Sequence, residues 1–255
     1  TSGHTLTVAN DNTVRGLTLR AASGYALAAS GITGLTVGNV SIQNAVGGIT
    51  FDSVSGAVTF TNVPINTTLN SGNAGLSILN SSATISLINS PITTTVGHPL
   101  RVATYTGTLT LDSASDISST SGQSLLLNQL SATAVVTLGG VNITTGGGHS
   151  VELSNNNANA QVNFEEGVTA NATNGAAFIS YLGGGKLKIS GTTNSLTSNG
   201  QTALHLSGVE LTQGVTFASL NSTNSTGYGL FIQNPVGTHD VSVTGTTTLT
   251  NVQGL

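Results

Sequence analysis

Pairs of apolar residues, each pair separated by one residue, return along this chain at a nearly constant interval. The first pair of each unit begins at Leu6, Leu27, Ile49, Leu76, Leu100, Leu125, Val151, Phe178, Leu204 and Leu230. From Leu76 onward the successive intervals are 24, 25, 26, 27, 26 and 26 residues. Alternation with a period of two is typical of β-strands, because successive side chains of a strand point to opposite faces. The chain therefore repeats one unit that opens with a strand.

A second alternating pair follows the first after 9 or 11 residues, and a third apolar position comes later in each unit. The second pairs begin at Val58, Ile85, Leu109, Val136, Val162, Leu187, Val215 and Val241. The third positions are Ile65, Ile92, Ile117, Ile143, Val168, Leu196, Leu220 and Leu249. Gly, Asn and Ser fill the gaps, and these residues tolerate a positive φ at tight bends. Each unit is predicted to hold three short strands and three turns.

A unit of this kind cannot bury its apolar side alone, so successive units are expected to stack. We predict an all-β fold, a single-stranded parallel β-helix or β-solenoid of about ten coils of about 25 residues, with three short strands in each. An antiparallel sandwich also has many short strands with turns roughly every 8 to 12 residues. It does not predict that one apolar register returns in every unit, so the solenoid is favoured.

Hydroxyl and amide side chains take the place of charge in this chain. Only 5% of the residues are charged, whereas an ordinary globular protein has about 25%. The basic residues are scattered, so no stack of coils builds a phosphate-binding patch; they are Arg15, Arg20, Arg101, Lys186 and Lys188. We therefore expect no nucleic-acid partner. A net charge of −4 and the lack of an apolar run of about 20 residues also argue against membrane binding and insertion.

Cys, Met and Trp are absent. The lack of Cys excludes a disulfide framework and thiolate metal sites, and it is compatible with an extracellular protein. Because Met is missing, we expect that Thr1 is not a natural start. We expect residues 1–255 to form a single β-helix domain that is a fragment of a longer repeat protein.

Several units resemble a known group of repeats. They read NGQTALHLSG at 199–208, GVTFASLNSTNSTGYGLFIQN at 214–234 and GGHSVELSNNNANAQVNFEEG at 147–167. These units are similar to the degenerate right-handed parallel β-helix repeats of large secreted bacterial proteins, including autotransporter passengers and adhesin-like surface proteins. The resemblance covers the chain from about Leu6 onward. It implies a right-handed coil, export to the cell surface or beyond, and a longer parent chain, but no particular chemistry.

The same fold carries polysaccharide lyases and glycoside hydrolases, whose chemistry needs clustered carboxylates. Equivalent residues of adjacent coils are about 4.8 Å apart. Asp112 aligns with Gly139 and then with Glu165, two coils away. That separation, on the order of 9.6 Å, is too large for the carboxylate pair of a retaining glycosidase.

The remaining acidic residues also fail to gather in the sequence alignment. Glu165 and Glu166 are expected at a corner, facing Lys186 or Lys188 of the next coil. The others fall at different register positions of separate units: Asp52, Asp116, Glu210 and Asp240. We therefore predict no catalytic residues, no cofactor site, no metal site and no enzymatic activity.

Polar residues recur at two register positions and indicate surface ladders. Before the opening strand, the aligned residues are His98, Gln123, His149, Ala176, Gln201 and Tyr228. Gln123 separates two imidazoles by a coil, and a closed metal site needs four ligands within about 2 Å, so a polar ladder is favoured over a metal site. Four residues after an opening apolar residue, Asn80, Asn155 and Asn234 indicate a bend with an amide ladder.

These observations favour an extracellular structural or adhesive rod on the bacterial cell surface. Its expected partners are a host or environmental surface, a glycan, or further copies of the chain. Ten coils at about 4.8 Å give a rod on the order of 50 Å long. Two alternatives stay open: a polysaccharide-active β-helix enzyme, and a self-assembling filament subunit, since the end coils of a solenoid expose unpaired backbone.

Overall fold

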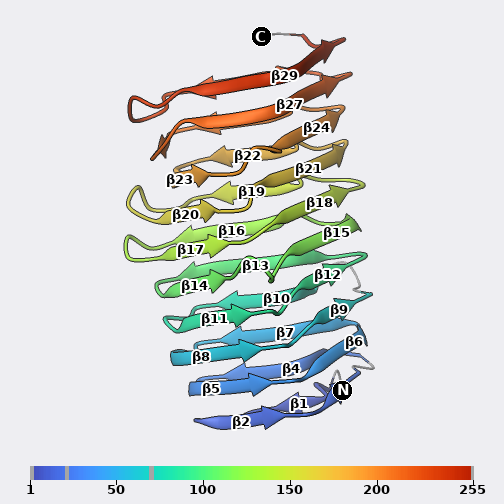
Figure 1. The fold of residues 1–255 in the computed structure, drawn as a ribbon, viewed down its shortest axis with the longest axis vertical. Helices are drawn as coiled ribbons and strands as arrows, with labels where there is room; N and C mark the ends of the chain where they lie inside the picture. The colour runs from blue at the N-terminus through green and yellow to red at the C-terminus, as the bar shows by residue number, and fades with distance from the viewer. Residues whose placement is uncertain (1–2, 21–22, 69–71, 254–255) are drawn as a thin grey trace.

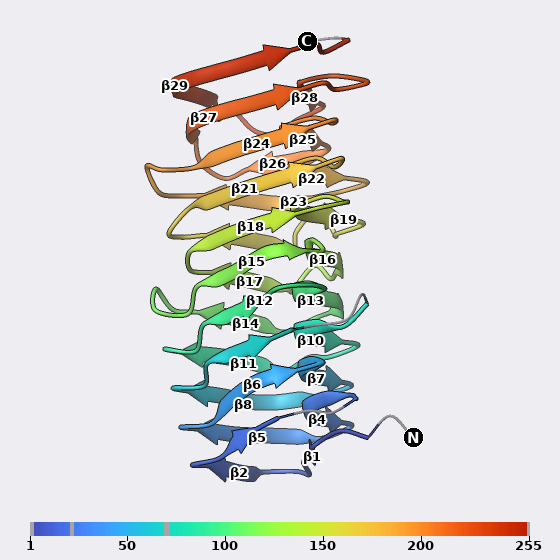
Figure 2. The same cartoon turned by 90° about the vertical axis from the view of Figure 1, so that its right-hand side faces the viewer.

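All regular secondary structure in the described part of the chain consists of β-strands. The computed structural model describes residues 3–20, 23–68 and 72–253. The strands wind around one axis, and each coil lies on the coil before it, from the N-terminus at one end to the C-terminus at the other (Figure 1). Turned by 90°, the rod shows one sheet with its strands stacked like rungs, among them β15, β18 and β21 (Figure 2).

Three parallel sheets form the sides of the rod. Sheet A contains β1 (Leu6–Thr7), β4 (Tyr25–Ser30), β7 (Gly47–Asp52), β10 (Ala74–Leu79), β13 (His98–Tyr105), β16 (Leu125–Leu130), β19 (Val151–Ser154), β22 (Phe178–Tyr181), β25 (Leu204–Ser207) and β28 (Leu230–Gln233). Sheet B contains β2 (Asn12–Arg15), β5 (Thr33–Gly38), β8 (Ser55–Thr61), β11 (Thr84–Ile88), β14 (Thr108–Leu111), β17 (Val135–Leu138), β20 (Gln161–Phe164), β23 (Gly185–Ile189) and β26 (Val209–Leu211). Sheet C contains β3 (Thr18–Leu19), β6 (Ser41–Ala45), β9 (Ile65–Thr67), β12 (Ile92–Thr94), β15 (Ile117–Gly122), β18 (Val141–Thr145), β21 (Val168–Thr173), β24 (Ser195–Asn199), β27 (Val215–Thr223) and β29 (Val241–Thr250).

The predicted parallel β-solenoid with three strands per coil is confirmed. The first residues of the opening pairs stack in one register on sheet A, for example Leu76 on Leu100 and Val151 on Phe178. The second pairs from Val58 to Leu187 stack in the same way on sheet B. Their side chains meet inside the rod and form one continuous core.

The strand assignment of the last two second pairs is wrong. Leu187 of sheet B pairs with Leu211, whereas Val215 and Val241 pair with each other in sheet C. The left-handed turn at Gly208 (φ 62°) starts the sheet B strand directly after β25, so the later apolar pair lengthens β27 instead.

The third positions do not share one register in sheet C. Ile117 pairs with Val141, which pairs with Val168, so Ile143 lies two residues further along the sheet. The third positions of the next two coils after Val168, Leu196 and Leu220, stack in line with Ile143. Leu249 lies two residues beyond Thr247, the partner of Leu220. A sheet C strand can therefore begin before the apolar residue that marks it, and apolar spacing alone does not reveal where it begins.

From β4 onward, one residue at the end of each sheet A strand or directly after it makes the corner in the left-handed conformation. This position is held by Gly31, Ser53, Asn80, Thr104, Gln129, Asn155, Leu182, Gly208 and Asn234, with φ between 49° and 64°. The backbone N–H at the corner continues the stacking, since the amide of Asn80 donates to the carbonyl of Ala103 (3.1 Å) in the next coil. Gly and Asn are the residues that adopt this conformation most readily.

Candidate functional site

The outer surface of sheet A carries a row of side chains that changes in character along the rod. Register pairing places one residue of each coil in this sheet A outer row: Thr7, Ala28, Thr50, Ser77, Arg101, Leu126, Glu152, Ile179, His205 and Phe231. The first four members are small and the last six are large. The matching row of sheet C consists only of hydroxyl and amide residues: Thr93, Ser118, Asn142, Thr169, Ser195 and Ser219.

Aromatic side chains outside the core are confined to sheet A. Six of the ten Phe and Tyr side chains are buried inside the rod: Phe51, Phe60, Tyr105, Phe164, Phe178 and Phe217. The other four are Tyr25, Tyr181, Tyr228 and Phe231. Three of them lie on β4, β22 and β28, and Tyr228 lies two residues before β28. One side of the rod therefore differs in chemistry from the other two.

A hollow of about 340 Å³ lies over the small members of the row, at the N-terminal end of sheet A. We call it the sheet A hollow, and it is lined by His4, Thr7, Tyr25, Ala28, Ala29, Ser30, Thr50, Asp52 and Leu79. Tyr25 and His4 stand together at one rim, with their ring centroids 6.1 Å apart. Gly47 makes room for the Tyr25 ring, since a Cβ there would lie 2.8 Å from the ring carbon Cδ1.

Asp52 stands at the opposite rim of the sheet A hollow. Its Oδ1 accepts hydrogen bonds from Asn80 Nδ2 (3.0 Å) and from Ser53 Oγ (3.2 Å). Both donors are neutral, and no ion pair of Asp52 exists among the described residues. No Lys or Arg lines the hollow. This rim therefore carries an uncompensated negative charge.

At the C-terminal end of sheet A, aromatic rings cluster on the surface. The ring centroid of Phe231 lies 4.6 Å from that of His205 and 4.9 Å from that of Tyr228. Burial lowers the pKa of His205, and His149 nearby lowers it further. Two coils before Phe231, the Tyr181 hydroxyl donates to Glu152 Oε1 (2.9 Å). Burial and this carboxylate raise the pKa of Tyr181.

The residues of the predicted imidazole ladder lie beside this surface, but they bond to backbone and not to one another. His98 Nδ1 is 2.7 Å from the carbonyl oxygen of Ser124, and His149 Nδ1 accepts from the Ala176 amide (3.0 Å). Gln123 Oε1 accepts from the Gly72 amide (3.3 Å). Among the described residues, no three His, Asp or Glu side chains gather as metal ligands.

Gln201 lies one residue outside the predicted ladder position. Because Leu204 pairs with Leu230, Thr202 is the residue that aligns with Tyr228. The Thr202 hydroxyl donates to the carbonyl oxygen of Tyr228 (2.8 Å). The other members of the ladder stand two residues before the opening apolar residue of their coil, whereas Gln201 stands three residues before Leu204.

The predicted bend at Asn80, Asn155 and Asn234 is present, since all three residues are left-handed. They lie three coils apart, however, so they do not contact one another. Real amide ladders run through two other sets: Asn39, Asn62 and Asn89, with Nδ2 to Oδ1 distances of 3.1 and 2.8 Å, and Asn199, Asn224 and Asn251, with both distances at 3.0 Å. The first set has a signal in the sequence, because each Asn stands three residues before an Ile of sheet C.

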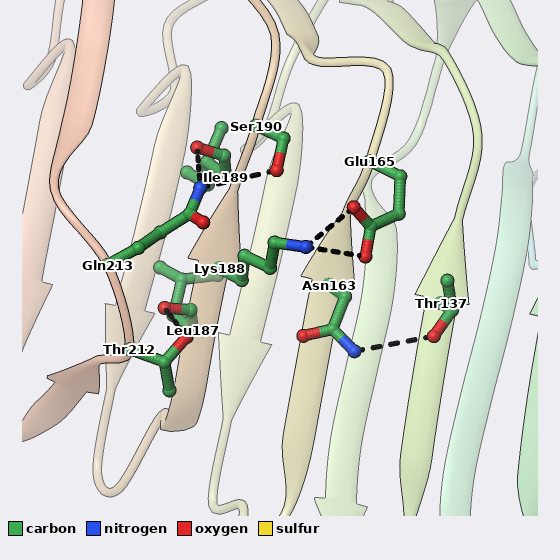
Figure 3. Close-up of polar contacts among 9 residues, drawn as sticks. All are labelled: Thr137, Asn163, Glu165, Leu187, Lys188, Ile189, Ser190, Thr212 and Gln213. Atoms are coloured by element: carbon green, nitrogen blue, oxygen red, sulfur yellow. Dashed lines mark hydrogen bonds and ion pairs between the residues drawn. The ribbon is translucent and has the colours of Figure 1, made fainter.

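The prediction that a corner carboxylate faces Lys186 or Lys188 is confirmed. Lys188 Nζ lies 2.8 and 3.0 Å from the two carboxylate oxygens of Glu165 (Figure 3). Lys186 Nζ lies 3.9 Å from Glu210 Oε2. Both pairs are partly exposed, and pairs of this kind contribute little to stability. These four charged side chains of sheet B and its corners are therefore paired with one another within the fold.

Two other carboxylates line one depression, although the alignment placed them at different register positions. Asp116 and Glu166 both line a shallow depression of about 320 Å³ at the start of sheet C. Ile117 pairs with Val141, which pairs with Val168, so the two carboxylates belong to coils two apart. Asp116 Oδ1 accepts from the Gly140 amide (3.0 Å), and both carboxylates are exposed. Asp116 stands one residue before Ile117 and Glu166 two residues before Val168, so register counting alone does not place them in one depression.

Comparisons of this chain with protein-family models, with curated proteins and with solved structures find no match. Within the described residues, none of the structure is a helix long and apolar enough to cross a membrane. The case for a function therefore rests on the side chains of the three faces and on their geometry.

Proposed function

We propose that this chain is part of an extracellular, non-catalytic rod on the bacterial cell surface, and that the outer face of sheet A is its adhesive surface. The observation that carries the proposal is that every Phe and Tyr ring outside the core lies on a strand of sheet A or within two residues of one. Aromatic residues are enriched where proteins meet partners, because a ring buries much area with little loss of conformational entropy. The described outer faces of sheets B and C carry hydroxyl and amide side chains, with charged side chains on sheet B as well, but no Phe or Tyr ring.

Adhesion of beads coated with this chain to cells and to glycan-coated plates tests the proposal. Replacing Tyr228 and Phe231 by Ala is expected to lower the number of bound beads severalfold. The matched control replaces Thr137 and Asn163 by Ala, because this pair is bonded (3.3 Å) on the outer face of sheet B (Figure 3). Equal adhesion by both double variants, or none by the unaltered chain, would refute an adhesive sheet A.

A polysaccharide-active enzyme is the second candidate, and the depression with Asp116 and Glu166 favours it. Residues two coils apart are separated by on the order of 9.6 Å, near the upper limit for an inverting pair. A general acid needs a pKa raised by burial or by a neighbouring charge, however, and both carboxylates are exposed. Release of reducing ends from neutral or acidic polysaccharides, abolished in Asp116→Asn, would establish this second function in place of the first.

A further inference from the structure

We propose that the sheet A hollow binds a short sugar chain that carries protonated amino groups, an oligomer of hexosamine. This inference rests on the proposed adhesive function and names the ligand class of one part of that surface. The floor of the hollow is made of the small side chains Thr7, Ala28 and Thr50. Its volume of about 340 Å³ is in the range of small-ligand sites.

The negative charge of Asp52 at the rim of the sheet A hollow favours a ligand with a protonated amino group. Asp52 accepts both of its hydrogen bonds through Oδ1, so Oδ2 has no partner among the described residues. A protonated amine donates to that oxygen and neutralises the carboxylate. The face of the Tyr25 ring also attracts a cation. A uronic acid would bring a second negative charge to this rim, where no Lys or Arg is present to receive it.

The length of the hollow calls for more than one sugar ring. Tyr25 and Ser30 are the two ends of β4, and Ser30 pairs with Asp52. Five residue steps along a strand span on the order of 16 Å. A short oligomer reaches across, with one pyranose ring against Tyr25 and an amino group of a later ring at Asp52. The hydroxyls of Thr7, Ser30 and Thr50 line the path between them.

Calorimetric titration of the 255-residue chain with three hexasaccharides tests the assignment. The probes are fully deacetylated glucosamine hexamer, its N-acetylated counterpart and hexagalacturonate. The deacetylated hexamer is expected to bind most tightly and the uronate not at all. Asp52→Asn is expected to weaken binding of the deacetylated hexamer about fivefold, because a partly exposed charge pair contributes only modestly to the free energy of binding. The same variant is expected to bind the N-acetylated hexamer as the unaltered chain does. Tyr25→Ala is expected to weaken both.

Glu166→Gln is the matched control, since it removes one exposed carboxylate from a different face of the rod. If it weakens binding as much as Asp52→Asn does, the attraction is to the overall negative charge and the inference fails. No binding by the unaltered chain also overturns it. Thermal unfolding of each variant shows that the fold is kept. If the chain binds no hexasaccharide but its adhesion still depends on Tyr228 and Phe231, the sugar assignment fails and the proposed adhesive function stands. If adhesion is absent as well, both the sugar assignment and the adhesive function are refuted.

Discussion

Single residues in the left-handed conformation hold the corners of this rod, and Asn62 shows what each contributes. Its φ is 56°, its Nδ2 donates to Asn39 Oδ1 (3.1 Å), and its Oδ1 accepts from Asn89 Nδ2 (2.8 Å). Asn62→Ala removes both bonds and keeps a Cβ without the amide group that makes the left-handed conformation tolerable for Asn, and that conformation then costs about 1–2 kcal/mol. Asn62→Gly removes the bonds and also the Cβ, so it carries no such cost. Urea unfolding is expected to show the Ala variant to be the less stable, and equal stability of the two would contradict a role for the conformation.

A half-buried imidazole, that of His98, makes the stability of the rod depend on pH. Burial lowers the pKa of His98 below its ordinary value of 6.5; the Ser124 carbonyl raises it, Arg101 lowers it and Glu152 raises it. The unfolded chain therefore takes up a proton that the folded chain resists, so stability is full above pH 6.5 and is lost as the pH falls toward the folded pKa.

His98→Gln is accordingly expected to reduce the loss of unfolding free energy between about pH 7.5 and about pH 5. Urea unfolding at the two pH values measures this loss. The control is His239→Gln, since His239 is exposed in the segment between β28 and β29. A loss that is the same in the unaltered chain and in His98→Gln would show that other groups cause the pH dependence.

At the scale of strands, the interior of the coil depends on aromatic contacts between sheets. Phe164 of β20 is fully buried, and its ring centroid lies 5.8 Å from that of Phe178 of β22. Phe164→Ala is expected to lower the free energy of unfolding by about 3–5 kcal/mol, because a cavity remains. Phe164→Leu keeps most of the volume and is expected to cost much less. Phe231→Ala, on the outer face, serves as control, and a comparable loss in that variant would argue against the core assignment.

The order of the strands was predictable because a period of two and a period of about 26 coexist in the sequence. The register failed where two alternations compete, as at Leu211 and Val215, and where a sheet C strand begins before the apolar residue that marks it, as at Ile143. The Asn39 ladder and the Asp116 depression were missed for another reason. Both involve residues at corners, where the backbone conformation decides which polar side chains come close to one another. The hydrophobicity pattern does not show this conformation.

At the scale of the whole molecule, the candidate site was only partly accessible from the sequence. Tyr228 and the imidazoles were recognised as recurring polar positions. The hollow was not, because its floor arises from the small residues Thr7, Ala28 and Thr50 on one face, and small residues carry no signal of their own. Recognising it requires knowing that Ala28 and Thr50 pair across coils and that Asp52 lies at their edge.

The C-terminal coil bears on how copies of this 255-residue chain associate. Ile232 continues the buried row of Leu206 but is 40% exposed, and Val236 is 56% exposed. Strand edges and apolar side chains together form a template for a further parallel coil. A contact of this end with the first coil of another copy is head-to-tail and does not close, so it builds chains of rods.

Sedimentation velocity over a range of concentrations is therefore expected to show species that grow with concentration. Replacing Ile232 and Val236 by Lys is expected to suppress them, because charge at an exposed edge opposes strand pairing. Leu182→Lys is the matched control, since Leu182 is 69% exposed at a corner away from the end coil. Suppression by Leu182→Lys alone would place the contact on the side of the rod, and then lateral association, not end-to-end growth, would govern how this protein assembles.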